Sequence, residues 1–222
     1  MIWRDRPRHC VSWHPHLASA VWLIVLPNRQ IRARHDGETV RVYQAYGEHI
    51  AGPAVGAQRF VSPFRMGRMT WVKPSFCWMM YRCGFASKAG QERVLAIDVS
   101  REGFDWALTH AALSHFDPAV HASPETWEER RDASPVRVQW DPERDIMLRR
   151  LEYRSIQIGL SGEAARRYVE EWTVRIADVT DLAVRLRERP EPERQAAAAE
   201  VLEQERPYPM PEEAAGHLLP RE

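Results

Sequence analysis

Residues 91–100 read QERVLAIDVS, and this stretch decides the fold more than any other part of the chain. Its centre, VLAIDV, is a nearly continuous apolar run, which is typical of a strand that is buried on both faces. Ser100 is placed to cap a helix over residues 101–113, in which Phe104 and Leu108 face inward. The stretch therefore predicts a buried strand that leads directly into an amphipathic helix.

Both strands and helices are also expected in the segments before and after residues 91–100. Residues 39–46, TVRVYQAY, alternate in the manner of a half-buried strand. Further strands are expected over residues 69–73, 136–140, 153–160 and 173–177, and further helices over residues 48–58, 75–83, 124–133 and 162–172. Because clean strand–helix–strand repeats are few, we expect an α+β fold, a single compact domain with a mainly antiparallel sheet flanked by helices.

The chain divides into three parts. Residues 1–28 have no sustained hydrophobic period and are expected to be a disordered leader or an extension read from an upstream start codon. Residues 29–183 form the predicted α+β domain. Residues 184–222 are rich in charge, alanine and proline, which favours a charged helical and flexible tail.

Composition narrows the class of protein. The length of 222 residues and the 44% hydrophobic content suit one substantial globular domain. Three cysteines at irregular spacing exclude a disulfide framework and a four-thiolate zinc site, so we expect a reducing, cytoplasmic environment. The apolar run over residues 21–26 is far shorter than the roughly 20 residues of a membrane span, and no membrane partner is expected.

Residues 59–93 are a cationic aromatic segment in a chain whose formal net charge is zero. Seven basic and seven aromatic side chains lie there with Glu92 as the single acid. The basic ones include both lysines of the chain, Lys73 and Lys88. Local positive charge among aromatic rings favours an anion with a flat base, so we expect a nucleotide or a nucleic acid as partner.

Lys73 is the centre of this segment. The proline after it favours an extended backbone at Lys73 and a helix start just beyond, so Lys73, Ser75 and the free N–H groups of that helix are candidates to bind a phosphate. The other candidate ligand-binding side chains within the segment are Arg68, Trp71, Trp78, Tyr81 and Arg82. The alternative is that the aromatic rings belong to the core and the arginines are solvated or paired.

Glu92 and His115 are the candidate catalytic residues. Glu92 is the acid nearest to the cations, although an ion pair with Arg93 or Arg82 would also explain it. His115 suits a hydrogen-bonding or acid–base role near a pocket. The histidine spacings in this region do not place imidazoles on one helical face, and no metal site is expected.

Seven motifs in order resemble the bacterial family of domain of unknown function 4291. They are RQIRA at 29, VYQAY at 42, RMTWVKPSF at 68, QERVLAI at 91, LSHFDPAVH at 113, SPVRVQWDPER at 134 and YRSIQIGLSG at 153. The resemblance covers about residues 29–183 and implies no particular reaction.

A weaker likeness is to the ADP-ribosyltransferases, small α+β domains that split around NAD. The likeness implies that Arg41 or Gln44 holds the cofactor, that Tyr81 or Trp78 stacks on nicotinamide, and that Glu92 stabilises the ribosyl cation. The later strand of this chain carries Gln157 where a glutamate is expected.

Three functions compete at this point. The first is an enzyme that uses NAD to transfer ADP-ribose, with Lys73, Arg68 and Arg41 on the pyrophosphate. The second is a non-catalytic nucleic-acid-binding module, in which the cations meet phosphates and the rings meet bases. The third is a structural or regulatory partner protein without a ligand. The sequence does not fix the oligomeric state.

Overall fold

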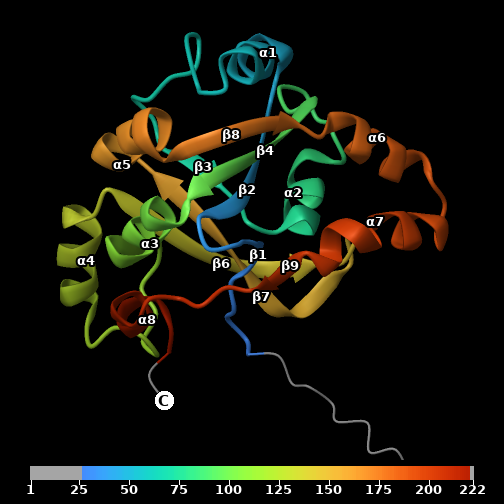
Figure 1. Cartoon of the computed structure of the whole chain (residues 1–222). Coiled ribbons are helices and arrows are strands. Elements are labelled where there is room, and N and C mark those ends of the chain that lie inside the picture. The colour runs from blue at the N-terminus through green and yellow to red at the C-terminus, as the bar shows by residue number, and fades with distance from the viewer. Residues whose placement is uncertain (1–26, 221–222) are drawn as a thin grey trace, which may run out of the picture.

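The computed structural model describes residues 27–220, and it places two main sheets at the centre of the molecule (Figure 1). The first sheet has the order β2-β4-β8, with β2 over Thr39–Tyr46, β4 over Arg93–Ser100 and β8 over Thr173–Asp178. Both of its strand pairs are antiparallel. The predicted leader lies almost wholly outside the described residues.

The second sheet has four strands in the order β3-β7-β6-β5. Its strands are β3 (Thr70–Val72), β7 (Arg150–Leu160), β6 (Val136–Arg144) and β5 (Ala111–Leu113). Within it β5 pairs with β6 in parallel, whereas the other pairs are antiparallel. A small antiparallel pair joins β1 (Arg32–Arg34) to β9 (Glu205–Pro207). The predicted α+β fold with a mainly antiparallel arrangement is confirmed.

Helices flank these sheets (Figure 1). They are α1 (Glu48–Ala57), α2 (Phe76–Cys83), α3 (Arg101–Thr109), α4 (Pro124–Ala133), α5 (Gly162–Arg167), the π-helical turn η1 (Tyr168–Trp172), α6 (Thr180–Glu188), α7 (Glu193–Glu203) and α8 (Glu212–Leu218). No helix within residues 27–220 has both the length and the apolar character that a membrane span requires.

Two hydrophobic clusters share the three-stranded sheet. Val42 of β2 and Ile97 of β4 belong to the larger cluster, which also takes in the core face of β6 and β7 and the helix α3. Tyr43 and Ala96, which alternate with them, belong to the second cluster with α2 and α6. The predicted α2 stripe of Phe76, Met79 and Met80 lies in this second cluster, so β4 is buried on both faces, as its apolar run indicates.

The helix predicted over residues 101–113 ends earlier than expected. Helix α3 stops at Thr109, and Ala111, Ala112 and Leu113 become β5. Their backbones pair with Val136–Val138 of β6, and all three side chains are buried. A long-range strand pairing thus overrides a local apolar pattern that suits either kind of element.

The charged helical and flexible tail predicted for residues 184–222 contains helices, and up to residue 220 it packs against the rest of the fold. The segment is helical in α6 and α7, but β9 then pairs with β1, and the backbone of Tyr208 donates a hydrogen bond to Ile31 O at 2.8 Å. Leu218 is fully buried, and Trp140 donates from Nε1 to its carbonyl oxygen at 3.1 Å. A few apolar residues anchor the segment to the core. The average composition of the segment, rich in charge, alanine and proline, gives no sign of these contacts.

Candidate functional site

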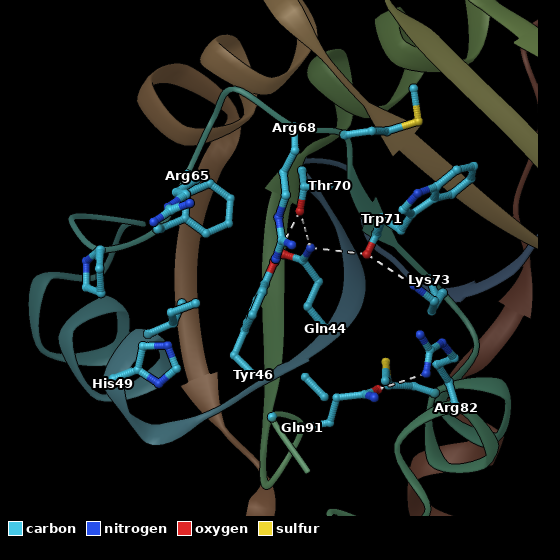
Figure 2. A pocket seen from close by; sticks show the side chains of 17 residues that line it. Gln44, Tyr46, His49, Arg65, Arg68, Thr70, Trp71, Lys73, Arg82 and Gln91 are labelled. Atoms are coloured by element: carbon cyan, nitrogen blue, oxygen red, sulfur yellow. Dashed lines mark hydrogen bonds between the residues drawn. The ribbon is translucent and has the colours of Figure 1, made fainter. Parts of the chain in front are cut away.

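A cavity of about 660 Å³ opens beside the edge where β2 meets β3. Its walls come from β2, the start of α1, the connection from residue 63 to residue 69, β3, and the facing side of α2. Figure 2 shows Arg65 and His49 on one side, Lys73 and Arg82 on the other, and Arg68 reaching between them over Gln44 and Tyr46. The structure therefore brings together the side chains of Arg65, Arg68, Lys73 and Arg82, which the sequence spreads over 18 positions.

The cavity is strongly cationic. Arg65, Arg68, Lys73 and Arg82 all line it, and within residues 27–220 no aspartate or glutamate does. Arg65 and Arg68 are exposed and have no ion-pair or side-chain hydrogen-bond partner among the described residues. Arg82 donates only to Gln91 Oε1, at 3.3 Å. Because no local carboxylate neutralises these groups, the cavity attracts anions.

Lys73 is the one deeply buried cation of the cavity, with 6% of its surface exposed. Its backbone exchanges hydrogen bonds with Tyr43, which confirms the extended conformation expected before proline. Its Nζ donates to Trp71 O at 3.2 Å and lies 5.4 Å from the centre of the Trp78 ring. Burial, assisted by the nearby charge of Arg82, lowers the pKa of Lys73 to about 7.

A buried hydrogen-bond network forms the floor beneath the cations. The Gln44 amide donates to Thr70 Oγ1 at 2.8 Å and to Trp71 O at 3.1 Å, and its Oε1 accepts from the Tyr168 hydroxyl at 2.8 Å. Tyr46 OH lies 3.1 Å from the same Thr70 oxygen. Gln44 was predicted to hold a ligand, but its amide is used to fix β3 against β2.

The predicted aromatic residues separate into different roles. Trp71 is half-buried and lines the cavity, and its ring lies over Gly159, where an added Cβ would stand 3.0 Å from Trp71 Cε2 and 2.6 Å from Met69 Sδ. Trp78 is buried against the Lys73 ammonium group rather than lining the cavity. Tyr81 points away, with the Arg144 guanidinium 3.9 Å from its ring centre.

At Ser75 and the start of α2, where a phosphate site was predicted, the polar groups already bind other residues. Ser75 has 1% of its surface exposed, accepts from Trp78 N and donates to Glu143 Oε1 at 2.9 Å. The first free backbone N–H of the helix, that of Phe76, donates to Glu205 Oε1 at 2.7 Å. A carboxyl group from β9 therefore occupies the place that a phosphate would need.

Arg41 does not reach the cavity either. It faces Asp98 across the β2–β4 pair, and its Nε and Nη2 atoms donate to the two carboxylate oxygens at 2.8 and 2.9 Å. This side chain lines a separate cavity with Arg34 and Arg175. A cross-strand acid thus binds the guanidinium group that was predicted to hold a pyrophosphate beside Lys73.

Glu92 lies at the rim of the cavity and not in its wall. It is exposed, and one carboxylate oxygen accepts from the Gly90 N–H at 2.8 Å, a backbone hydrogen bond that lowers the pKa of Glu92. The predicted ion pair with Arg93 does not form, because Arg93 binds Glu48 and Asp178. Glu92 and His49 both lie beside Gly47, so this carboxylate is unpaired next to a residue that lines the cavity.

His115 is exposed and lines a different cavity, of about 270 Å³, with Arg29, Asp117 and Arg154. The two predicted catalytic residues therefore do not share a cavity. Between residues 27 and 220, no group of three histidine, cysteine, aspartate or glutamate side chains is arranged to hold a metal ion.

Four polar residues of the main cavity are not among the predicted site residues, namely Tyr46, His49, Thr70 and Gln91. Tyr46 lies on the same face of β2 as Gln44, so the alternation of residues 39–46 could have predicted that Tyr46 lines the same site. Thr70 and His49 carried none, because only the pairing of distant strands brings them to the site.

One comparison with known proteins identifies a relationship. A family model described as domain of unknown function (DUF4291) matches residues 30–208. The matched region begins before β1 and ends after β9, so it extends beyond residue 183, where the sequence motifs end. No curated protein matches the chain.

Proposed function

The chain belongs to the family of domain of unknown function (DUF4291), and we propose that it binds a nucleotide through the cavity lined by Arg65, Arg68, Lys73 and Arg82. The observation that supports this proposal is the set of cations on one cavity without a lining carboxylate among the described residues. Phosphate groups are the anions that arginine recognises best, since the guanidinium group offers paired N–H donors.

Size and shape favour a nucleotide over a small inorganic anion. A volume of about 660 Å³ falls within the usual range of small-molecule sites. Trp71 offers an aromatic face in the wall, and Phe64 adds a second ring. The phosphates would lie against the cations while a base stacks on a ring, an arrangement in which each half of the ligand meets a suitable surface.

Transfer of ADP-ribose from NAD is the candidate reaction, and the position of Glu92 favours it. An unpaired carboxylate at the rim of a nucleotide site can stabilise positive charge that develops on the ribose as the bond to nicotinamide breaks. Nicotinamide would leave as a neutral molecule, and an acceptor nucleophile would take the ribose carbon. Of the aromatic residues, Trp71 is placed to meet the leaving group, rather than Trp78 or Tyr81.

Ligand-dependent thermal stabilisation tests the binding proposal. NAD, ADP-ribose, ATP and a nucleoside 5′-monophosphate are titrated into the full chain, since a ligand that binds only the folded state raises its stability. We expect Arg68→Ala to weaken binding roughly tenfold, because a charge-assisted hydrogen bond contributes about 1.5–3 kcal/mol. Arg59→Ala removes an exposed arginine outside this cavity and serves as the matched control. If none of the four compounds stabilises the wild-type chain, the proposal fails.

Release of nicotinamide tests the reaction separately. If the chain turns over NAD, Glu92→Gln should reduce nicotinamide release by at least tenfold while NAD binding stays within twofold of wild type. Binding without any release in the wild type would exclude the transferase and leave a nucleotide-binding protein.

A further inference from the structure

The smaller cavity beside His115 contains an unusual concentration of unsatisfied polar atoms. Five buried side-chain nitrogen or oxygen atoms in residues 27–220 have no hydrogen-bond partner. Two of them, Arg29 Nη1 and Ser114 Oγ, belong to residues that line this cavity. A third is Nε2 of His121, whose Nδ1 lies 3.2 Å from the backbone nitrogen of the lining residue Asp117. Buried polar groups normally have partners, so these atoms are available for hydrogen bonds with water or with a polar ligand.

The outer face of the four-stranded sheet connects the two cavities. The strand register places Trp71 beside Gly159 and Gly159 beside Arg137, in one row across β3, β7 and β6. In the next row Gln157 of β7 pairs with Gln139 of β6. Lys73, the residue after the last paired residue of β3, Val72, lies at the β3 end of this row. Adjacent strands lie about 4.8 Å apart, so Lys73 and Gln139 are separated by two strand spacings, roughly 10 Å. Gln139 and Asp141 line the smaller cavity.

This face offers polar groups that are not used within the described fold. Gln157 donates from Nε2 to Gln139 Oε1 and Asp141 Oδ2, both at 2.6 Å. Gln157 Oε1 and Gln139 Nε2 have no partner among the described residues, and both side chains are only half-buried. Amide groups of this kind bind the edges of unstacked bases.

Positive charge along this path is concentrated at the first cavity, and in the smaller cavity Arg29 and Arg154 balance Asp117 and Asp141. The acids there are already engaged, because Asp117 binds Arg29 and Asp141 accepts from Gln157. Cations at the first cavity, beside an aromatic ring and free amides, form the kind of surface that single-stranded nucleic acids use.

We infer that the ligand of this protein is a single-stranded nucleic acid, with one nucleotide in the cavity at Lys73 and the neighbouring nucleotides crossing the outer sheet face to the cavity at Ser114 and His115. This inference rests on the proposed nucleotide binding at the first cavity and names its substrate class. It assigns to Trp71 the stacking of a base, to Gln139 and Gln157 contacts with base edges, and to Arg29, Ser114 and His115 a second phosphate.

Fluorescence anisotropy with labelled oligonucleotides tests the inference. A nucleoside 5′-monophosphate, competing with the label, and single-stranded hexamers of DNA and RNA are compared on the full chain. We expect a hexamer to bind at least tenfold more tightly than the monophosphate. Its salt dependence should also be steeper, because each additional phosphate contact adds about −0.7 to the slope of log affinity against log salt. Ser114→Ala and His115→Ala should each weaken hexamer binding three- to tenfold, whereas Arg175→Ala, which removes an exposed arginine elsewhere, should not.

The outcomes separate this inference from the proposed function. If the monophosphate binds and the hexamer binds no more tightly, the second subsite is excluded while nucleotide binding stands. If the hexamer binds tightly but Ser114→Ala and His115→Ala both bind it as wild type does, the path is wrong. If neither ligand binds, both proposals fail. Tight hexamer binding that only Arg68→Ala and the two subsite variants weaken supports the path described.

Discussion

Lys73 is the residue in which the fold and the proposed function meet. Its backbone joins β3 to β2, its Nζ is held by the Trp71 carbonyl oxygen, and the Trp78 ring lies beneath its charge. Burial makes the ammonium form costly, and the neighbouring guanidinium group of Arg82 adds to that cost. A bound phosphate would reverse the balance, so Lys73 should take up a proton when the ligand enters.

The titration of Lys73 tests this coupling directly. Because its pKa of about 7 lies below the 10.5 of an ordinary lysine, we expect it to lose its proton near neutral pH in the free protein. On ligand binding the pKa should rise, and affinity for an anion should fall by up to tenfold per pH unit above 7. The chain has only two lysines, so NMR of ¹³C-labelled lysine resolves the signal, and Lys88→Arg assigns it. A Lys73 signal that stays unchanged up to pH 9 contradicts the prediction.

The predicted residues Arg68, Trp71, Lys73 and Arg82 all line the main cavity, and the information that places them there is local. They lie within 15 positions, so a strand and a helix that meet at Pro74 suffice to bring them together. The positions of Arg41 and Ser75 have distant causes. Arg41 is bound by a carboxylate 57 residues away, and the start of α2 is occupied by a carboxyl group 129 residues away. No single-sequence pattern reports such partners.

At the scale of elements, helix α3 depends on a residue that helix propensity disfavours. Gly103 lies in its first turn against η1, and an added Cβ would stand 2.3 Å from Cγ of Trp172. The close approach of α3 to η1 is therefore possible only because position 103 has no side chain. The indole ring is buried and cannot move aside without disturbing the larger cluster.

We expect Gly103→Ala to destabilise the protein by about 1–3 kcal/mol, the usual cost of overpacking. The matched control is Gly56→Ala in helix α1, where an added Cβ meets no atom within 4 Å. There alanine should be neutral or stabilising by up to about 1 kcal/mol, because it favours a helix more than glycine does. Urea denaturation measures both variants. If both substitutions changed the free energy of unfolding equally, the contact with Trp172 would not be what excludes a side chain at position 103.

Strand β9 buries an acid that the fold does not neutralise. Glu205 is buried at the start of α2 near Glu143, and burial raises the pKa of both carboxyl groups. A raised pKa means that the folded state binds more protons than the unfolded one, so stability from this group is present at low pH and is lost as pH rises through the folded pKa. The hydrogen bond from Phe76 N partly offsets that loss.

Glu205→Gln should therefore stabilise the protein at pH 8 and lose its advantage at pH 4. The glutamine keeps an oxygen that can accept from Phe76 N, while it removes a carboxyl group that would be charged at high pH. A gain of 1 kcal/mol corresponds to about 2–4 °C in Tm for a chain of this size. Scanning calorimetry between pH 4 and pH 8 measures the Tm of the wild type and of Glu205→Gln. A variant with a lower Tm than the wild type at pH 8 would contradict the prediction.

Most of the longer elements could be predicted from their own residues, and the three-residue β3 was also expected, within residues 69–73. Strand β4 has a continuous apolar run, and α2 has a three-residue stripe, so both were identifiable from the sequence. Strands β5 and β9 have three residues each, too few for a period to be visible. They exist because β6 and β1 offer backbone partners, which is information that only the assembled sheets contain.

At the scale of the whole molecule, the C-terminal segment joins parts that the sequence separates. Strand β9 pairs with β1 near the other end of the described chain (Figure 1). Tyr208 donates to Asp105 of α3 at 2.6 Å, and Leu218 belongs to the larger hydrophobic cluster. The three-stranded sheet contributes side chains to both hydrophobic clusters. A loss of packing in one cluster should therefore destabilise the other as well. The domain should unfold as one cooperative unit.

Leu218→Ala tests that cooperativity. Truncating a fully buried leucine costs about 2–5 kcal/mol, and a single unit predicts the same shift of the urea midpoint by tryptophan fluorescence and by far-ultraviolet circular dichroism. Gly216→Ala, on the same helix, meets no atom within 4 Å and should cause no loss of stability. If residues 205–220 were an independent tail, Leu218→Ala would leave both midpoints unchanged. If the two probes shifted by different amounts, the two clusters would have to unfold separately.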